Sequence, residues 1–493
     1  MPQKIYNSAT RNKEILKTVQ DGKVGIYVCG ITAYDVCHIG HARGAVVFDV
    51  LVRHLRSRGY EVVYVKNFTD IDDKIIERAQ KEKISIAEIS ERYIALHDED
   101  MKELNVQTPT LTPKATQHIP DMIELISILV DKGYAYCADG DVYFSIEKFS
   151  SYGKHSGRNI EEMIAGSRVN INDKKKNPLD FALWKASKPG EPFWESPWGN
   201  GRPGWHIECS AMSRRYLGDT FDIHGGGEDL VFPHHENEIA QSQAATGKPP
   251  ANYWIHNGFV RINSEKMSKS LGNVFSVREI IKSYHPEVVR LFILQSHYRS
   301  PIDFSESSLA ETRSALVRCY TALQQQKELL SDSSEADALN ESNLSETAKS
   351  YIEKLKELEI NFGDSLDDDF NTAQALGYVF EAVRLLNNIF VAKKGITAND
   401  KRNILQVSKK LFEHFGLVLG IFQYDPDNYF IIDKEKESSK RGLDISQIES
   451  LIEERKTARQ AKNWARADEI RDQLAMMNVV LKDTNNTTTW IIE

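Results

Sequence analysis

The N-terminal part of the chain alternates apolar and polar positions in a way that predicts a strand, a helix and a second strand. Residues 23–30, KVGIYVCG, alternate with a period of two and end at Gly30. Residues 42–59 place apolar side chains at helical spacing and stop at Gly59, and residues 60–68 are rich in β-branched and aromatic side chains. This order predicts a parallel sheet that binds its ligands at the carboxyl ends of its strands.

The pattern changes after residue 113. We expect a helix at about residues 113–132, then a hairpin that turns at Asp139, Gly140 and Asp141, and then a stretch rich in Pro, Gly and Trp. Strand and helix patterns alternate again from residue 205 onward. We therefore predict a sheet domain made of residues 1–113 and 201–258, with residues 114–200 inserted between its two halves.

The second half of the chain has the periodicity of helices. Residues 306–425 predict a helical bundle, interrupted by SDSSEADALNESN, which we interpret as a solvated acidic linker. A second polar stretch, residues 425–444, is expected to separate a small C-terminal unit of residues 445–493.

Composition and charge narrow the class of protein. A chain of 493 residues exceeds the size of a single core, so three to five domains are expected. It has no long apolar run and no apolar signal sequence, so we expect neither a membrane span nor export. Its five scattered cysteines fit a reducing compartment, and we expect a cytoplasmic protein.

The net charge of −9 argues against bulk, non-specific binding to nucleic acid. Residues 455–471 are an exception, because this short helical segment holds six Lys or Arg residues against Asp468 and Glu469. The net charge therefore does not exclude a nucleic acid that is recognised by this local basic patch.

Two histidines flank a glycine in the segment His38-Ile39-Gly40-His41, between the first strand and its helix. A helix N-terminus presents unpaired N–H groups, Gly40 lets a ligand approach the backbone, and imidazoles donate hydrogen bonds to phosphate oxygens. The position favours a phosphate site over the alternative, a helix start that holds two histidines by chance.

The segment KMSKS, residues 266–270, follows a predicted strand and precedes a predicted helix. Lys266 and Lys269 on such a loop can close over a triphosphate and neutralise charge that develops during displacement. Two lysines at this spacing more often belong to a solvated surface, which is the alternative.

Four residues carry side chains that zinc accepts as ligands. Cys29 ends the first strand, Cys209 lies on a predicted helix, and His234 and Glu238 are four residues apart on another. Their elements could converge at one edge of the sheet, but no Cys-x-x-Cys pair is present, and each residue taken singly is more often structural.

Two further segments hold candidate site residues. HGGGED, residues 224–229, places three glycines after a short strand, where a flat ligand could lie against the backbone or the chain could simply turn. TDIDDK, residues 69–74, resembles an acidic metal cluster, but we favour helix capping by its aspartates and lining of the site by Thr69.

In combination, these segments resemble a known family. The His-Ile-Gly-His turn and the downstream KMSKS are similar to those of class I aminoacyl-tRNA synthetases, which implies a Rossmann-like, doubly wound parallel sheet. The surrounding segments resemble the bacterial cysteinyl-tRNA synthetases more narrowly, as far as the TTTW near the C-terminus: YVCGITAYDVCHIGHAR, NFTDIDDKII, GRPGWHIECSAM, FDIHGGGEDLVFPHHENEIAQS and EKMSKSLGN.

The resemblance implies roles that spacing alone does not give. It implies one zinc ion per chain, bound by Cys29, Cys209, His234 and Glu238. It implies ATP, accompanied by Mg²⁺, bound at His38, Gly40, His41, Lys266 and Lys269. It implies an amino-acid pocket lined by Cys29, Thr69, Trp205, Asp229 and His234.

The resemblance also implies a tRNA partner. Residues 259–305 would form a KMSKS-bearing region that contacts the tRNA stem, and residues 445–493 an anticodon-binding domain. Within that domain Arg459, Trp464 and Asp468 would contact anticodon bases, although Trp464 could instead pack against a helix. We expect a monomer.

The implied activity joins L-cysteine to tRNA(Cys) in two steps. Cysteine and ATP give cysteinyl-adenylate and pyrophosphate, and the cysteinyl group then passes to the 3′-terminal adenosine. We expect His38 and His41 to stabilise the α-phosphate and Lys266 and Lys269 the leaving pyrophosphate. Because zinc prefers a thiolate to a neutral hydroxyl, it would recognise the substrate sulfur and exclude serine, and residues 114–200 look too short for an editing domain.

Two alternatives differ in the acceptor or in the chemistry. A cysteine ligase that acts on a small-molecule amine would share the catalytic half but lack the tail of residues 445–493. A non-catalytic RNA-binding paralogue would be favoured by loss of a motif histidine or lysine, yet His38, His41, Lys266 and Lys269 are all present.

Overall fold

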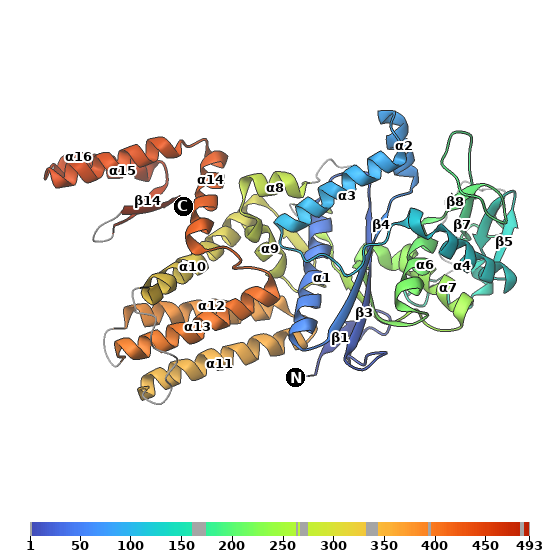
Figure 1. Cartoon of the computed structure of the whole chain (residues 1–493), viewed down its shortest axis with the longest axis horizontal. Helices are drawn as coiled ribbons and strands as arrows, with labels where there is room; N and C mark the ends of the chain where they lie inside the picture. Colours follow the sequence, from blue (N-terminus) through green and yellow to red (C-terminus); the bar gives the residue numbers. More distant parts are fainter. Residues whose placement is uncertain are drawn as a thin grey trace. The chain divides into compact units, whose positions relative to one another are not determined.

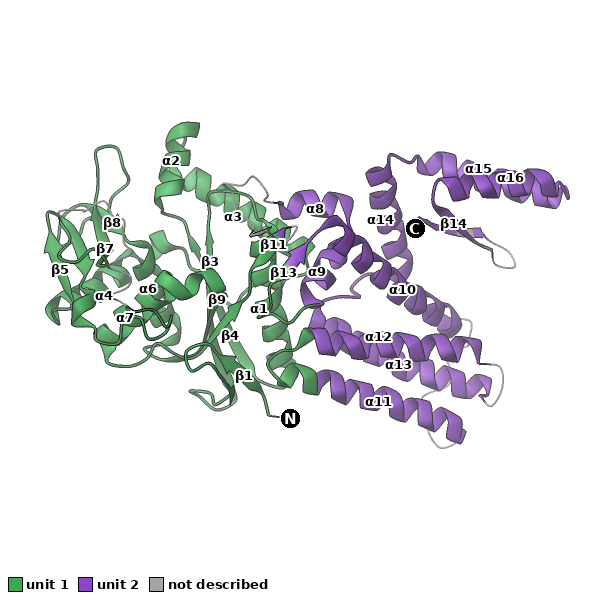
Figure 2. Ribbon diagram, turned by 180° about the vertical axis from the view of Figure 1, so that it is seen from behind, with its two compact units in different colours: residues 1–261, 296–302, 364–372 green, residues 262–295, 303–363, 373–493 purple. Residues whose placement is uncertain are grey.

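The computed structural model describes residues 2–159, 174–262, 265–266, 275–331, 344–392, 396–483 and 488–492. The chain forms two compact units, which Figure 2 distinguishes by colour. The first comprises residues 1–261, 296–302 and 364–372, and the second comprises residues 262–295, 303–363 and 373–493. Among the described helices, none is both long and apolar enough to span a membrane.

A parallel sheet forms the centre of the first unit, as the sequence predicts (Figure 1). Its strand order is β10-β9-β3-β4, and every neighbouring pair runs parallel. The strands are β3 (Lys23–Thr32), β4 (Glu61–Thr69), β9 (Phe221–Gly227) and β10 (Ala251–Asn257). The carboxyl ends of all four strands therefore meet at one edge, which is where an open α/β sheet binds its ligands.

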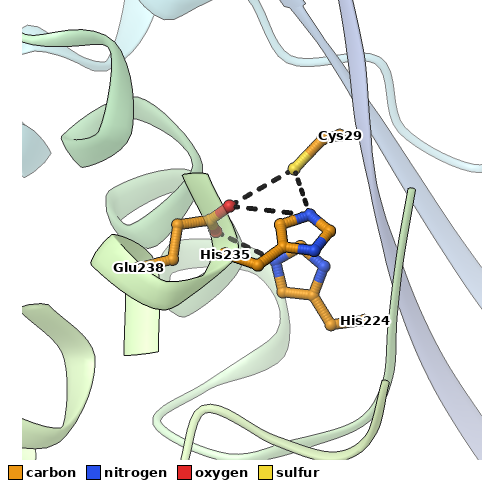
Figure 3. A group of neighbouring side chains, drawn as sticks. All are labelled: Cys29, His224, His235 and Glu238. Atoms are coloured by element: carbon orange, nitrogen blue, oxygen red, sulfur yellow. Dashed lines mark hydrogen bonds and ion pairs between the residues drawn. The ribbon is translucent and has the colours of Figure 1, made fainter. Parts of the chain in front are cut away.

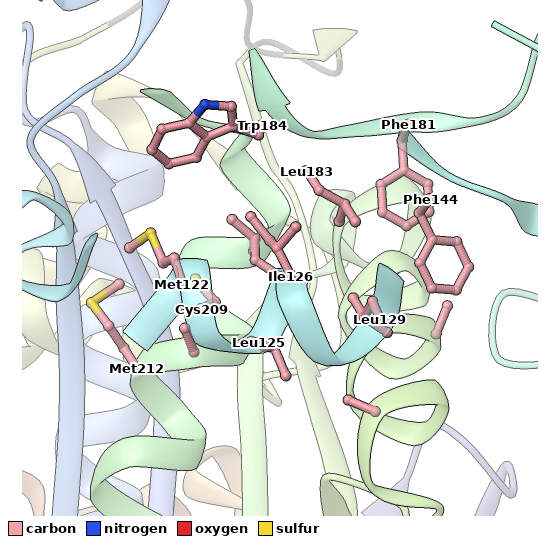
Figure 4. Packing of buried hydrophobic residues seen from close by; sticks show 14 of the residues in the cluster. Met122, Leu125, Ile126, Leu129, Phe144, Phe181, Leu183, Trp184, Cys209 and Met212 are labelled. Atoms are coloured by element: carbon pink, nitrogen blue, oxygen red, sulfur yellow. The ribbon is translucent and has the colours of Figure 1, made fainter. Parts of the chain in front are cut away.

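Helices cover both faces of this sheet. Tyr27 on β3 points into a core built with α4 (Ile119–Asp131), α6 (Trp205–Leu217) and α7 (Glu236–Thr246), part of which Figure 4 shows. The opposite face receives α1 (Ile39–Ser57), whose Phe48 packs against Gly225 on β9 so closely that a Cβ there would lie 2.3 Å from the ring. Because successive side chains along a strand point to opposite faces of the sheet, the two faces pack into two separate cores.

A small antiparallel sheet of order β5-β6-β7-β8 follows, and its last strand, at residues 201–203, extends beyond the predicted end of the insertion at residue 200. Its strands are β5 (Ala135–Ala138), β6 (Asp141–Phe144), β7 (Phe181–Ala186) and β8 (Gly201–Pro203). Asp139 and Gly140 join β5 to β6 with φ values of 49° and 83°, which fits a two-residue type I′ turn and confirms the predicted hairpin.

The remaining elements of the first unit flank these two sheets. They are β1 (Lys4–Asn7), β2 (Asn12–Ile15), α2 (Asp73–Glu82), α3 (Ile86–Glu103), and the short helical segments η1 (Ala115–His118), η2 (Ile146–Lys148), η3 (Glu228–Leu230) and η4 (Val231–His235). Three short strands follow where the chain passes between the units: β11 (Val260–Ile262), β12 (Glu265–Lys266) and β13 (Ile302–Phe304).

The second unit is mostly helical, as predicted. Its helices are α8 (Val277–Ser283), α9 (Pro286–Leu294), α10 (Glu306–Ser331), α12 (Thr372–Val391), α13 (Ala398–Leu419) and α14 (Pro426–Arg441). The long helix α11 (Glu346–Asp367) also lies here, except for its last residues, which belong to the first unit. The predicted acidic linker falls largely on residues 332–343, outside the described residues.

Most of the polar stretch of residues 425–444, which the sequence predicts only as a separator before the C-terminal unit, is a helix, α14. Asp425 accepts a hydrogen bond from the backbone N–H of Asp427, and Pro426 occupies the first helical turn. Tyr429 and Phe430 bury one side of the helix against the bundle. Two buried aromatic side chains and a capped start thus stabilise a helix in which half of the residues are charged.

The C-terminal residues form a helical hairpin beside a two-stranded sheet. The helices are α15 (Ile445–Gln460) and α16 (Trp464–Met476), and the antiparallel strands are β14 (Val479–Asp483) and β15 (Thr488–Ile492). These elements enclose a small core of their own, built from Ile448, Ile470, Leu474, Val479, Trp490 and Ile492.

Candidate active site

A bulge near the end of β3 sets the position of Cys29. The pairing of β3 with β4 shifts register between Val28 and Ile31, so one extra residue is accommodated there. The backbone N–H of Gly30 donates to Asn67 Oδ1 at 2.8 Å instead of joining the regular ladder. The bulge leaves the Cys29 side chain half-buried at the carboxyl end of the sheet.

Cys209 approaches Cys29 from helix α6. Its thiol is buried, 3.6 Å from Cys29 Sγ and 3.7 Å from Asn67 Oδ1. Helix α6 can start this close to the inserted sheet because Gly204 precedes it: a Cβ there would lie 2.0 Å from the carbonyl oxygen of Ala182.

His234 and Glu238 reach the same place from the connection that follows β9. The sequence predicts one helix through both residues, but His234 lies in the short segment η4 and Glu238 in α7. The kink is at Phe232, within η4 and before His234, while His235 and Glu236 have right-handed helical φ and ψ, so the backbone runs on from η4 into α7. The expected proximity holds nevertheless, because His234 Nε2 lies 3.0 Å from Glu238 Oε1.

The side chains of Cys29, Cys209, His234 and Glu238 therefore converge, with one potential ligand atom from each within 4.8 Å of all the others. Tetrahedral zinc, with bonds of about 2.0–2.3 Å, needs ligand atoms about 3.3–3.8 Å apart. The Cys29 Sγ distances of 3.6 Å to Cys209 Sγ and 3.4 Å to Glu238 Oε1 meet this requirement. Two thiols, an imidazole and a carboxylate are also a donor set that zinc accepts.

Two histidines that the sequence does not single out as ligands adjoin this group (Figure 3). His224, on β9, places Nε2 2.9 Å from Glu238 Oε2, and His235 places Nε2 3.5 Å from Cys29 Sγ. Together with Cys29 and Glu238 they form a second set of potential ligand atoms within 4.8 Å. His224 lies in HGGGED and His235 beside His234, but only the fold shows that both point toward Glu238.

Burial and mutual contacts set the charges in this group. Burial raises the pKa of Glu238, but His224 and His234 outweigh it and hold that pKa well below its usual range. Burial also raises the pKa of Cys209, yet the hydrogen bond from Cys29 and the proximity of His234 bring it down to about 6. Burial, with Cys209 and Glu238 nearby, raises the pKa of Cys29 well above its usual value. The group therefore holds a carboxylate and one readily ionised thiol, as a cation site requires.

Trp205, predicted to line the amino-acid pocket, stands beside the group. Its ring stacks on His234 with centroids 4.2 Å apart, and 39% of its surface is exposed. The neighbouring His206 places Nδ1 2.9 Å from His234 Nδ1, so one of the two nitrogens carries the shared proton. Trp205 and His206 thus fix the His234 ring from two sides.

The other predicted pocket residues differ in their surroundings. Thr69 is buried, and its hydroxyl donates to Glu208 Oε2 at 2.7 Å. Asp229 is exposed in η3. The predicted capping by the TDIDDK aspartates is found at Asp72, which accepts a hydrogen bond from the backbone N–H of Lys74 at the start of α2. Sequence patterns gave no signal for Glu208.

His38, Gly40 and His41 lie at the N-terminus of α1, where the sequence predicts them. The two imidazole rings stack with centroids 3.6 Å apart. The backbone N–H of His38 donates to His41 Nδ1 at 3.4 Å, which places the proton of a neutral His41 ring on Nε2. That nitrogen is then a hydrogen-bond donor at the N-terminus of α1, where the helix dipole favours an anion.

The structure describes little of Lys266 and Lys269, the two lysines predicted to bind ATP. Lys269 lies outside the described residues, and of Lys266 the structure describes only the backbone, in β12.

The predicted anticodon residues lie around the turn of the C-terminal helical hairpin, in the second unit. Arg459 is in the last turn of α15, Trp464 starts α16, and Asp468 follows one turn later. All three side chains are exposed, and Trp464 exposes 58% of its surface. Asp468 pairs with Arg471 at 3.1 Å. The exposure of Trp464 disfavours the alternative that it packs against a helix.

Comparison with known proteins places these features in a family. Residues 15–314 match the family described as tRNA synthetases class I (C) catalytic domain. Residues 361–423 match the DALR domain, and residues 446–490 match the cysteinyl-tRNA ligase anticodon binding domain.

Curated relatives and solved structures agree with these matches. Cysteine–tRNA ligases of Geobacter sulfurreducens and Geobacter metallireducens are each 53% identical to the chain over 493 residues, which is 100% of both chains. The methionyl-tRNA synthetase of Mycobacterium tuberculosis shares the fold, with a TM-score of 0.61 at 14% identity over 81% of this chain and 92% of that one. A LeuRS–tRNA complex from Agrobacterium radiobacter covers 96% of each chain, with a TM-score of 0.60 at 12% identity.

Proposed function

The chain belongs to the cysteine–tRNA ligase family of class I aminoacyl-tRNA synthetases and is an aminoacyl-tRNA ligase, and we propose that it recognises cysteine through a zinc site. Membership of the family implies cysteine, ATP and tRNA as substrates. The proposed reaction activates L-cysteine with ATP to cysteinyl-adenylate and pyrophosphate, and then transfers cysteine to the 3′-terminal adenosine of tRNA(Cys).

One observation supports the recognition of cysteine most directly: the convergence of Cys29, Cys209, His234 and Glu238 at the carboxyl end of the sheet. These four residues would hold zinc: their donor types fit it, and so do the separations of Cys29 Sγ from Cys209 and Glu238. Zinc bound there would take the substrate sulfur as a further ligand and favour a thiolate over the neutral hydroxyl of serine. The fold thereby offers discrimination that pocket shape alone gives poorly for a near-isostere.

The remaining active-site residues position substrates and stabilise charge. Trp205 beside His234 forms an apolar wall for the short cysteine side chain, and Thr69 and Asp229 are the proposed contacts for its polar groups. His41 Nε2 donates to the α-phosphate region, with His38 stacked beside it. Lys266 and Lys269 are proposed to neutralise the leaving pyrophosphate, and Mg²⁺ would accompany ATP.

The tRNA is the proposed acceptor because the tail resembles an anticodon-binding domain. Residues 446–490 match that domain, which a ligase acting on a small-molecule amine would not need. Arg459, Trp464 and Asp468 present two charges and one aromatic face to solvent on the same hairpin, which suits contact with unstacked bases.

An aminoacylation assay tests this function. The purified chain is incubated with ATP, Mg²⁺, total tRNA and either radiolabelled cysteine or radiolabelled serine. We expect cysteine alone to be attached, and only to tRNA(Cys). Charging of another tRNA, or equal charging with serine, would contradict the proposal.

A further inference from the structure

A cavity of about 750 Å³ lies in the second unit, between helix α10, helix α12 and the last strand, β15. Residues 313–321 of α10 form one wall, residues 380–387 of α12 another, and Ile491 and Ile492 the third. Its volume is within the range of about 300–1,000 Å³ that is typical of small-ligand sites. None of its lining residues belongs to the first unit, which contains the candidate zinc site.

The lining of this cavity combines an apolar floor with a charged rim. Ala315, Val383 and Ile492 are buried, and Phe380, which is half-buried, is the aromatic residue of the lining. The guanidinium groups of Arg318 and Arg384 stand at the exposed rim. Arg384 pairs with Glu381 at 3.0 Å, but both side chains are exposed, and such a pair competes weakly with a ligand.

Arg313, the third arginine of the lining, has a structural role. It is buried and pairs with Asp433 of α14 at 2.7 Å, and it donates a hydrogen bond to the carbonyl oxygen of Ile492 at 2.9 Å. These contacts fix β15 against the bundle and neutralise the charge of Arg313. Arg318 and Arg384, the latter in its exposed pair with Glu381, are the lining arginines that remain to face a ligand.

The chemistry of the lining matches one nucleotide unit of RNA. A base presents a flat π-face for Phe380, and a neighbouring phosphate presents the anion that two guanidinium groups bind best. The chain as a whole carries a charge of −9, so a phosphate backbone would contact it only where arginines gather. β15 begins within residues 446–490, which match an anticodon-binding domain, and Ile491 and Ile492, which line the cavity, directly follow that match.

We infer that this cavity binds one unpaired nucleotide of the tRNA, its base against Phe380 and its phosphate between Arg318 and Arg384. The inference rests on the proposed function, since it needs tRNA as the partner. It adds a contact on the bundle to the anticodon contacts proposed for the helical hairpin.

The test measures binding of tRNA(Cys) transcript by fluorescence anisotropy over a series of KCl concentrations. For the double variant Arg318→Gln, Arg384→Gln, we expect a Kd about tenfold higher and a salt dependence whose logarithmic slope is smaller by about 2. For Phe380→Leu, which keeps an apolar side chain but removes the π-face, we expect a Kd about fivefold higher with an unchanged slope.

The control is Lys410→Gln, which removes one exposed positive charge from α13, outside the cavity. It should leave both the Kd and the salt slope as they are in the unaltered chain. Thermal unfolding of every variant shows whether the fold is retained, and the exposure of Arg318 and Arg384 makes their replacement compatible with it.

Two outcomes would overturn the inference. The first is an unchanged Kd and salt slope for tRNA in the double variant, as expected if the cavity binds an acidic peptide. The second is tight binding of AMP by the unaltered chain while the substitutions leave tRNA binding unchanged. Cysteine-dependent ATP–pyrophosphate exchange by the unaltered chain tests the proposed ligase activity independently of the cavity. Exchange without any cavity effect contradicts only the nucleotide site, whereas absence of exchange contradicts the proposed ligase.

Discussion

Single side chains in the candidate zinc site obtain their charge from burial and from one another. Glu238 is 1% exposed, yet its pKa is held low, because His224 and His234 contact its two oxygens and outweigh the burial that raises it. Burial raises the pKa of Cys209, but the hydrogen bond from Cys29 and the contact with His234 lower it to about 6. Burial lowers the pKa of His234, but the same anions raise it to about 10, so a proton on that imidazole compensates their charge, and a bound metal ion would take its place.

The buried hydrogen bond from Thr69 to Glu208 is expected to stabilise the fold. Replacing Thr69 by Val removes the only hydroxyl that donates to Glu208 among the hydrogen bonds of the described residues. Because Glu208 is 1% exposed, an unsatisfied carboxyl group there should cost about 1–3 kcal/mol of unfolding free energy. Urea denaturation followed by tryptophan fluorescence measures the loss.

Thr69→Ser is the matched control, since it keeps the hydroxyl and removes only a methyl group. It should retain most of the stability that Thr69→Val loses. A valine variant as stable as the unaltered chain would show that the Thr69–Glu208 hydrogen bond contributes nothing.

Among the elements, the bulged end of β3 is the one that determines the site. Cys29 and Gly30 lie where β3 and β4 lose regular pairing, and a Cβ on Gly30 would lie 1.5 Å from the carbonyl oxygen of Asn67. That backbone oxygen cannot give way as the end of a flexible side chain could. The close approach of two strands therefore requires glycine beside Cys29.

Gly30→Ala should accordingly separate β3 from β4 at the site. We expect a loss of about 2 kcal/mol or more of unfolding free energy, from strain of the kind that overpacking causes, together with weaker zinc retention. Gly44→Ala in α1 is the control, because its Cβ would meet nothing nearer than 3.5 Å, and alanine there should be neutral or stabilising. Equal melting temperatures of the two variants would contradict this account of the bulge.

Helix α13 starts with a capping box that makes its stability depend on pH. Thr397 and Asp400 bond reciprocally, and Asp400 also accepts the backbone N–H of Ser345. Burial raises the pKa of Asp400, but these backbone N–H groups outweigh it and lower the pKa to about 2. Because the folded-state pKa is depressed, the stabilisation is present above about pH 4 and is lost as the pH falls through about 2.

Asp400→Asn should cost about 1 kcal/mol near pH 7. The difference between the variant and the unaltered chain should shrink steadily between pH 4 and pH 2, where Asp400 becomes protonated in both folded and unfolded states. Denaturation at a series of pH values measures it. A difference that stayed constant down to pH 2 would mean that the carboxylate charge is irrelevant to the cap.

The elements of the first unit follow largely from local patterns, whereas parts of the site do not. Period-two alternation predicts β3 and β4, and Asp139 with Gly140 predicts the hairpin, because both signals are local. The zinc ligands could be suggested by residue type, but their convergence depends on strand order and on the close packing of Gly204 against Ala182, neither of which follows from a local sequence pattern. Local patterns do not indicate His224, His235 and Glu208, because their partners Glu238, Cys29 and Thr69 lie 14, 206 and 139 residues away in the sequence. Helix α14 was missed because two buried aromatic residues decide it among many charged ones.

The two proposed steps, activation of cysteine and its transfer to tRNA, depend on residues in separate units of the molecule. The candidate zinc group lies in the first unit, and the anticodon hairpin has its own core in the second. Changes in the hairpin should therefore affect the transfer to tRNA and leave the activation of cysteine intact.

Trp464→Ala tests this separation. Losing one base–aromatic contact, worth about 1–3 kcal/mol, should lower kcat/KM for tRNA(Cys) by about tenfold or more. Cysteine-dependent ATP–pyrophosphate exchange, which needs no tRNA, should be unchanged. Met476→Ala, which replaces another exposed side chain on α16, is the control and should alter neither rate. A parallel loss of both activities in Trp464→Ala would place the tryptophan in the fold of the unit.

The central claim is that the thiol-containing metal site distinguishes cysteine from serine. The most direct measurement is the ratio of kcat/KM for cysteine over serine in ATP–pyrophosphate exchange, with zinc content determined on the same samples. The account predicts about one zinc per chain and a large ratio for the unaltered chain, and loss of zinc with collapse of the ratio by about a hundredfold or more for Cys209→Ser. Undiminished preference for cysteine in a Cys209→Ser protein that has lost its zinc would contradict it.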